Sequence, residues 1–126
     1  DMILIKENHL RVLENQNKLD QLPEIISKAK KQHPNIEIEI EIETLEQLKK
    51  FKLNQVDYIL LDNFSLTDTK KAIELIKSKK YKAKIEISGN ITLDTIKNYT
   101  HLNIDRISVG ALTHSVNALD MSLIIL

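Results

Sequence analysis

Polar residues that could do chemistry stand at the ends of five short aliphatic runs. They comprise a lysine, several carboxylates, two serines and a glycine: Lys6, Glu39, Glu41, Asp62, Glu86, Ser88, Ser108 and Gly110. A lysine can bind an anionic substrate, while carboxylates can hold a metal ion or stabilise positive charge in a transition state. Taken singly, Lys6 could be a strand-end lysine and Asp62 a turn residue. Their joint occurrence at equivalent positions predicts one shared site.

One run, residues 36–43, reads "IEIEIEIE" and alternates four isoleucines with four glutamates. This period of two predicts a strand with one apolar and one acidic face. We expect the isoleucines to face helices and the glutamates to face the interior of a barrel, where Lys6 and a bound metal or ligand could offset their charge. Glu41 should then lie near the mouth, opposite Lys6 and beside Asp62, with Glu39 supporting it. Glu37 and Glu43 are expected to be ordinary solvated or capping residues.

The chain contains only two glycines, Gly89 and Gly110, and each follows one of the last two aliphatic runs. Glycine permits close backbone approach, and helix N-termini present free N–H groups to anions. The last two strand-to-helix loops are where barrel enzymes frequently bind a phosphate. We therefore favour phosphate binding here over the alternative that each glycine only serves a tight turn.

Strands and helices alternate along the sequence, which predicts an α/β fold with a parallel sheet. The expected strands cover residues 2–5, 36–42, 57–61, 83–87 and 105–109. A helix is expected over 22–32, and further helices should begin after Thr44, Ser65 and Thr92. An open doubly wound sheet would need G-x-G-x-x-G after its first strand, where "KENHLR" has no glycine. A (β/α) barrel is therefore favoured.

Five strands are too few to close a barrel of the usual eight. We therefore expect residues 1–126 to be the C-terminal half of a barrel, five βα units, within a longer polypeptide. The chain has 18 basic and 18 acidic residues, so it has no net charge that would attract nucleic acid or a membrane surface. It has no cysteine, so no thiolate metal site is possible. No apolar run approaches bilayer-spanning length. We expect a cytoplasmic protein, and no two histidines have metal-ligand spacing.

Five motifs together resemble the quinolinate phosphoribosyltransferase family, also called nicotinate-nucleotide pyrophosphorylase (carboxylating). They run in the family's order through nearly the whole chain: "LIKENH" from Leu4, "EIEIETLEQL" from Glu39, "LDNF" from Leu61, "EISGNI" from Glu86 and "ISVGALTHS" from Ile107. The resemblance implies a barrel enzyme of NAD biosynthesis. It would join quinolinate to 5-phosphoribosyl 1-diphosphate with Mg²⁺ and release diphosphate and CO₂ to give nicotinate mononucleotide.

The resemblance also implies roles for individual residues. Lys6 would contact a substrate carboxylate or phosphate, and Glu41 and Asp62 would hold the ribose hydroxyls and Mg²⁺, directly or indirectly. These three are the implied catalytic residues. A second set would bind substrate and its 5′-phosphate: Ser88, Gly89, Asn90, Ser108, Gly110 and His114. Asn90 and Asn103 stand where the family has glycine, and asparagine can still adopt a left-handed conformation.

Family members are typically dimers in which the amino-terminal domain of one subunit completes the other's site. That domain and the first barrel strands, with "TRKT" and "NHR" segments, are expected upstream, so we expect residues 1–126 alone to be inactive. Two alternatives stay open at this point. One is another phosphate-binding barrel enzyme, and the other is a non-catalytic domain that binds a phosphorylated ligand.

Overall fold

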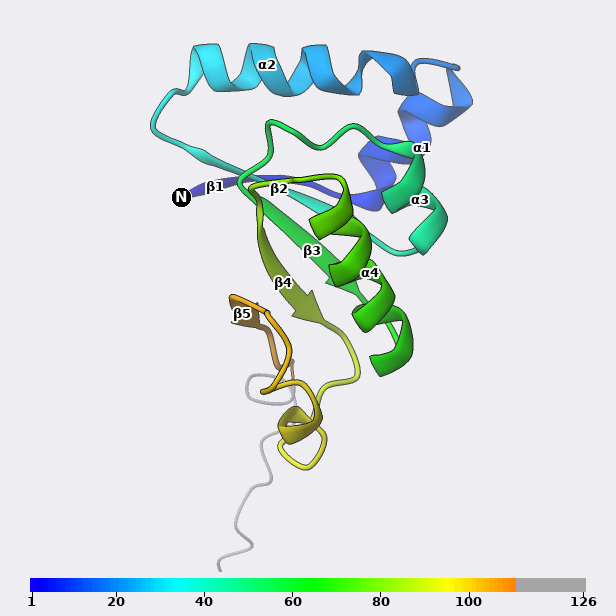
Figure 1. Ribbon diagram of the computed structural model, residues 1–126. Helices are drawn as coiled ribbons and strands as arrows, with labels where there is room; N and C mark the ends of the chain where they lie inside the picture. The colour runs from blue at the N-terminus through cyan, green and yellow to red at the C-terminus, as the bar shows by residue number, and fades with distance from the viewer. Residues whose placement is uncertain (111–126) are drawn as a thin grey trace, which may run out of the picture.

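The chain forms one sheet of five parallel strands (Figure 1), and the computed structural model describes residues 1–110. The strand order is β1-β2-β3-β4-β5, the order of the sequence. The strands are β1 (Met2–Ile5), β2 (Glu37–Ile42), β3 (Tyr58–Asp62), β4 (Lys84–Ser88) and β5 (Arg106–Ile107). A doubly wound sheet reverses its strand order at a switch point, whereas a barrel winds in one direction. The sequential order therefore agrees with the predicted barrel.

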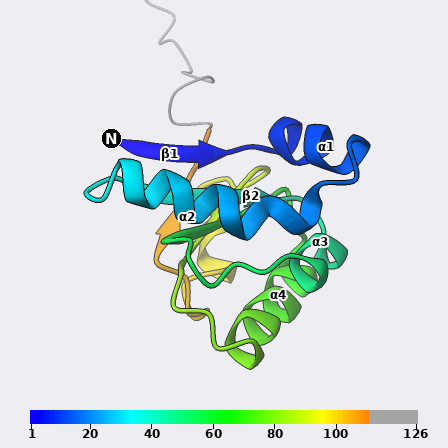
Figure 2. The same ribbon diagram turned by 90° about the horizontal axis from the view of Figure 1, so that it is seen from above.

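Helices fill the connections between strands. The helices are α1 (Glu7–Asn15), α2 (Leu22–Gln32), α3 (Leu45–Lys50) and α4 (Leu66–Ser78), with 3₁₀ turns η1 (Leu19–Gln21) and η2 (Ile96–Asn98). Helices α3 and α4 lie side by side over one face of the sheet (Figure 1), and α2 runs along β1 and β2 when the molecule is seen from above (Figure 2). The helix predicted over 22–32 is confirmed.

Two of the three predicted helix starts are confirmed by their caps. The N–H of Gln47 donates to Thr44 Oγ1 at 3.2 Å, and the N–H of Asp68 donates to Ser65 Oγ at 3.1 Å. The helix predicted after Thr92 is wrong, because only the short turn η2 forms there. Thr92 and Thr95 still cap each other, with the N–H of Thr95 donating to Thr92 Oγ1 at 3.3 Å and the N–H of Thr92 donating to Thr95 Oγ1 at 2.9 Å, but the segment continues only as a 3₁₀ turn.

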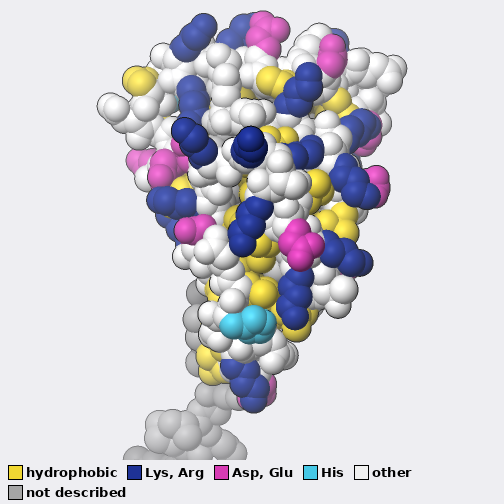
Figure 3. Space-filling model, viewed as in Figure 1, with side chains coloured by type: hydrophobic (Ala, Val, Ile, Leu, Met, Phe, Trp, Pro, Cys, Tyr) yellow, Lys and Arg dark blue, Asp and Glu magenta, His cyan; other side chains and the backbone are white. Residues whose placement is uncertain are grey.

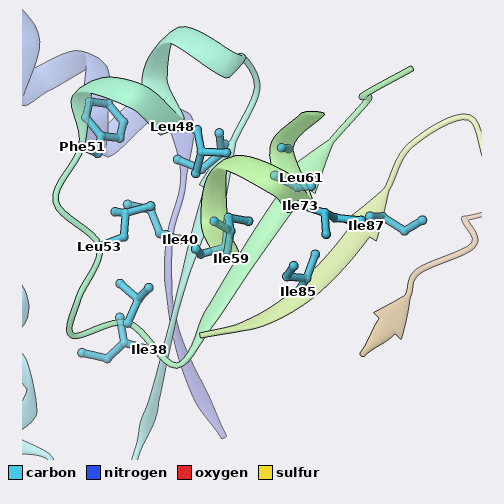
Figure 4. Close-up of a cluster of buried hydrophobic side chains, with 14 of the residues drawn as sticks. Ile38, Ile40, Leu48, Phe51, Leu53, Ile59, Leu61, Ile73, Ile85 and Ile87 are labelled. Atoms are coloured by element: carbon cyan, nitrogen blue, oxygen red, sulfur yellow. The ribbon is translucent and has the colours of Figure 1, made fainter. Parts of the chain in front are cut away.

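The core lies between the sheet and its helices (Figure 4). Ile38, Ile40 and Ile42 of β2 are completely buried on this side, as are Ile59 and Leu61 of β3. Leu48 of α3, Ile73 of α4 and Ile26 of α2 pack against them. The prediction that the isoleucines of "IEIEIEIE" face the helices is therefore confirmed. Burying each such side chain contributes roughly 1.5–3 kcal/mol, so β2 is held mainly by its apolar face.

The outer surface mixes charges of both signs. Lysine and arginine side chains scatter over the helical face and alternate with aspartate and glutamate (Figure 3), in line with the balanced composition of the chain. Among residues 1–110, the structure contains no helix long and apolar enough to cross a membrane.

The first strand forms an edge of the sheet and carries apolar surface. β1 pairs only with β2 in the described strands, and an apolar hollow of about 370 Å³ lies beside it. The hollow is lined by Ile3, Leu4, Ile5, His9, Val12, Leu13, Leu22 and Ile25. Val12 is 55% exposed and Ile25 is 41% exposed, so this side of the half barrel leaves aliphatic side chains uncovered.

Candidate active site at the carboxyl ends of the strands

The predicted carboxylates share the face of the sheet that points away from the core. The register pairs Glu41 with Leu60, Leu60 with Glu86, and Asp62 with Ser88. Because side chains alternate along a strand and paired residues point the same way, Glu41, Glu86, Asp62 and Ser88 lie on one side. Glu41 and Glu86 are buried there, and Asp62 and Ser88 end their strands half-buried.

Lys6 and the carboxylates of Glu41 and Asp62 come together at the mouth. Lys6 follows β1 and is the N-cap of α1. Burial raises the pKa of Glu41 to about 6, and the Glu7 carboxyl adds to this through a hydrogen bond and its charge. The charge of Lys6 acts in the opposite direction, and that of Asp62 raises this pKa further. The structure therefore brings the three predicted residues into one electrostatic cluster, while their catalytic roles stay predictions.

Glu7 is a member of this cluster that sequence reasoning missed. Burial acts to raise its pKa, but a hydrogen bond with Glu41 and the charges of Lys6 and Arg11 lower the pKa overall. The two pKa values shift in opposite directions, so Glu41 is the weaker acid of the two carboxyl groups. Glu7 Oε2 is buried and has no hydrogen-bond partner within residues 1–110. The available signal was position: Glu7 directly follows Lys6 in the first turn of a helix, where acidic residues are favoured.

The Asp62 carboxylate is held on both oxygens. Ser88 Oγ donates to Asp62 Oδ1 at 2.5 Å, and the amide of Asn63 donates to Asp62 Oδ2 at 2.8 Å. A carboxylate has about four lone-pair sites, so each oxygen retains one for a ligand. The arrangement fixes the direction of the group without using up its capacity to bind a hydroxyl or a cation.

The loop at Gly89 and Asn90 has a backbone conformation that glycine and asparagine adopt more readily than other residues. Gly89 has φ +80° and Asn90 has φ 52°, both in the left-handed region. The expectation that Asn90 can replace a family glycine in this conformation is confirmed. A Cβ on Gly89 would overlap the side chain of Asn63 and lie 2.9 Å from its backbone nitrogen. The β4 loop therefore passes too close to the β3 loop for any side chain at Gly89.

The second glycine loop is different. A Cβ on Gly110 would meet no atom within 4 Å, and the φ of this residue is not left-handed, so the described residues impose no need for glycine there. Ser108 Oγ donates to Glu86 Oε1 at 2.6 Å. The expectation of a left-handed Asn103 is wrong, since this residue is not among those with positive φ. His114 lies outside the described residues.

A second carboxyl pair, Glu39 and Glu86, lies on the same face, with Glu39 two residues before Glu41 on β2 and Glu86 in register with Leu60 of β3. Burial raises the pKa of Glu39 to about 7, and the charge of Glu86 and a hydrogen bond with it add to the shift. Glu39 Oε1 is buried without a hydrogen-bond partner in the described part of the chain. Arg106 Nη1 lies 3.6 Å from Glu86 Oε2. With a pKa of about 7, Glu39 is about half protonated at neutral pH, and its supporting part in the site stays a prediction.

Sequence reasoning also missed the cations at the start of the strands. Arg106 Nη2 donates to the hydroxyl of Tyr58 at 2.9 Å, and Lys84 Nζ donates to it at 3.0 Å. The Arg106 guanidinium also stacks 4.0 Å from the centre of the Tyr58 ring. Tyr58, Lys84 and Arg106 are the first residues of β3, β4 and β5. Tyr58 and Lys84 pair with each other two residues before Leu60 and Glu86, whereas Arg106 is in register with Glu86 and forms an ion pair with it.

The family model that matches residues 1–124 is that of the quinolinate phosphoribosyl transferase C-terminal domain. The chain belongs to this family. A probable nicotinate-nucleotide pyrophosphorylase (carboxylating) of Methanocaldococcus jannaschii is 37% identical over 127 residues, which cover 98% of this chain and 43% of that protein. The enzyme of the same name from Mycobacterium leprae is 33% identical and is covered to 41%.

Solved structures of the quinolinate phosphoribosyltransferase family share the fold. The crystal structure of NadC from Streptococcus pyogenes matches with a TM-score of 0.73 and 36% identity, over 95% of this chain and 39% of that one. The nicotinate-nucleotide pyrophosphorylase of Francisella tularensis matches with a TM-score of 0.70 and 34% identity, over 97% and 40%. The chain thus spans about two fifths of the length of these relatives, and its α/β sheet corresponds to part of their barrel domain.

Proposed function

We propose that the full-length protein containing this chain transfers the phosphoribosyl group of 5-phosphoribosyl 1-diphosphate to quinolinate. The products are nicotinate mononucleotide, diphosphate and CO₂. The single observation that carries the proposal is the cluster of Lys6, Glu41 and Asp62 at the carboxyl ends of three neighbouring strands in a chain of this family. The names of the relatives support the reaction, because several are called carboxylating nicotinate-nucleotide pyrophosphorylases.

The charges of the cluster suit such a reaction. Glycosyl transfer from a diphosphate donor develops positive charge on the ribose, which fixed carboxylates stabilise. Asp62, held by Ser88 and Asn63, is placed to accept ribose hydroxyls without reorganising. Lys6 carries positive charge beside these carboxylates and would attract the dianionic quinolinate or a phosphate. Glu41, whose pKa is raised to about 6, would still be mostly ionised at pH 7 and could accept a ribose hydroxyl or share a cation.

Mg²⁺ fits the donor chemistry of the site in part. Carboxylate oxygens are the ligands that Mg²⁺ prefers, and this ion usually takes one or two carboxylates together with substrate phosphates. Within residues 1–110, no three acidic, histidine or cysteine side chains form a set that could hold a metal. Glu41 and Asp62 would therefore share the ion with the diphosphate, whose departure the ion would assist by neutralising charge.

The 5′-phosphate would bind at the glycine loops. Gly89 and Asn90 turn the chain with two successive positive φ angles, and such turns expose backbone N–H groups that anions accept from. Ser88, Ser108 and Gly110 complete the proposed phosphate contacts, with His114 nearby in the sequence. About three fifths of the relatives' length lies outside this chain. We propose that this remaining part supplies the other contacts to quinolinate and that the full-length protein forms a homodimer.

The proposal is tested by incubating the purified full-length protein with quinolinate, 5-phosphoribosyl 1-diphosphate and Mg²⁺, and measuring nicotinate mononucleotide by liquid chromatography. Lys6→Ala and Asp62→Ala should each reduce kcat/KM by about 100-fold, the scale of one lost charged contact to a transition state. Lys28→Ala is the control, since Lys28 is exposed on α2 and its ion pair, with Glu24 at 2.8 Å, lies within the same helix. No product from the wild-type protein would reject the function, and full activity in both variants would reject the site.

A further inference from the structure

Asn63 connects the two halves of the proposed site. It directly follows β3, one residue after Asp62, and its side chain reaches in two directions. Its amide nitrogen donates to Asp62 Oδ2 at 2.8 Å, and its amide oxygen accepts from Asn90 Nδ2 at 3.2 Å. Its backbone N–H donates to the carbonyl of Ser88 at 3.0 Å. One residue thus contacts both the carboxylate and the β4 loop.

The backbone of Asn63 is part of the same arrangement. Its φ is 56°, a conformation that asparagine tolerates better than most residues. This turn directs the side chain against Gly89, where a Cβ would overlap the Asn63 amide. The positive-φ residues Asn63, Gly89 and Asn90 therefore lie against one another, with the Asn63 amide packed close to the backbone of Gly89.

We propose that Asn63 is a positioning residue that holds the Asp62 carboxylate and the Gly89–Asn90 turn in a fixed relation to each other. If the proposed function is right, the two ends of one substrate, the ribose and its 5′-phosphate, bind to these two groups. Their separation must then match the length of the ribose phosphate, and a misplacement of about 1 Å can cost about 100-fold in rate. Asn63 sets this separation by bonding to both sides at once.

Two variants separate the two contacts. Asn63→Gly keeps the positive φ and removes both side-chain bonds. Asn63→Asp is nearly isosteric: it keeps the oxygen that accepts from Asn90, removes the donor to Asp62 and places a like charge beside it. Asn17→Gly is the matched control, because Asn17 is exposed, has φ 51° and follows α1 outside the cluster.

We expect Asn63→Gly, in the full-length protein, to raise the KM for 5-phosphoribosyl 1-diphosphate about tenfold, the effect of losing one or two hydrogen bonds. Hydrogen–deuterium exchange of the segment that contains Gly89 and Asn90 should accelerate by a similar factor. Asn63→Asp should leave this exchange within about threefold of wild type and instead lower kcat about tenfold. Asn17→Gly should change neither quantity.

The exchange measurement keeps the inference separable from the proposed reaction. If the wild-type protein forms no nicotinate mononucleotide, the proposed function fails, but accelerated exchange in Asn63→Gly still supports the fixed loop. Unchanged exchange in Asn63→Gly overturns the inference whether or not the enzyme turns over. If Asn63→Gly does not fold, Asn63→Asp decides. An unaltered kcat in Asn63→Asp, or an equal change in kcat and in the exchange rate of the Gly89–Asn90 segment, would refute separate roles for the bonds to Asp62 and to Asn90.

Discussion

Replacing Gly89 by alanine tests whether the close packing of the two loops is needed for folding. The substitution adds one methyl group at φ +80°, against the side chain and backbone nitrogen of Asn63. The chain offers a matched control, because its other glycine, Gly110, is not left-handed and a Cβ there would meet no described atom within 4 Å. Both substitutions make the same chemical change, in different surroundings.

The expected loss of stability for Gly89→Ala follows from three contributions. An alanine in the left-handed region costs about 1–2 kcal/mol. Moving Asn63 aside breaks its bonds to Asp62 and Asn90, at about 1 kcal/mol each. The stiffer unfolded chain returns roughly 0.4–1 kcal/mol. The free energy of unfolding should therefore fall by about 2–3.5 kcal/mol, whereas Gly110→Ala should leave it within about 0.5 kcal/mol of wild type.

Urea denaturation of the full-length protein, followed by far-ultraviolet circular dichroism, measures these differences. If the urea midpoint falls while the dependence of the unfolding free energy on urea concentration is unchanged, the substitution has lowered stability and has not altered the compactness of the folded or unfolded state. A Gly89→Ala variant as stable as wild type would show that Asn63 and the β4 loop are not in contact as described. Equal destabilisation by Gly110→Ala would show that the effect belongs to glycine generally and not to this fit.

The remaining predictions concern titration and the isolated chain. Glu39 has a pKa of about 7 in the folded state against an ordinary 4.5. Between these two pH values the folded protein therefore keeps a proton on Glu39 that the unfolded chain releases. The free energy of unfolding should therefore fall by at most about 3 kcal/mol between pH 4.5 and 7, and Glu39→Gln should remove this slope in pH-dependent denaturation. Burial acts to raise the pKa of Asp57, but its bonds with Lys30 and the N–H of Ile38 lower the pKa overall. Asp57→Ala should thus cost about 1–3 kcal/mol at pH 7, a difference that vanishes as the pH falls below 3.8. Residues 1–126 alone should form no nicotinate mononucleotide in the assay above, and measurable product would contradict the need for the rest of the protein.

The sequence predicted the elements whose pattern and caps agree. The alternation of "IEIEIEIE" identified β2 and both of its faces, because a strand between a helical layer and a polar interior must alternate strictly. The first and third strands were predicted to within one residue, and α2 to its limits. These segments combine apolar periodicity with a clear helix or strand boundary.

The features that the sequence did not predict depend on contacts between distant segments. Nothing local shows that Glu7 would meet Glu41, or that Arg106 and Lys84 would converge on the Tyr58 hydroxyl. The segment after Thr92 has the predicted cap but continues only as a 3₁₀ turn, a difference in backbone bonding that periodicity and cap residues do not reveal. Asn63 was part of a quoted motif, but its role became visible only through its fit against Gly89.

The acidic face of β2 has a consequence for how the sheet assembles. A slip of β2 by one residue against β1 or β3 would exchange its two faces. Glu39 and Glu41 would then enter the aliphatic layer beneath the helices, where an unpaired carboxylate is strongly unfavourable. The isoleucines would be stranded among Lys6, Asp62 and Glu86. β2 therefore disfavours wrong pairings by itself and can fix the alignment of its two neighbours, β1 and β3, during folding.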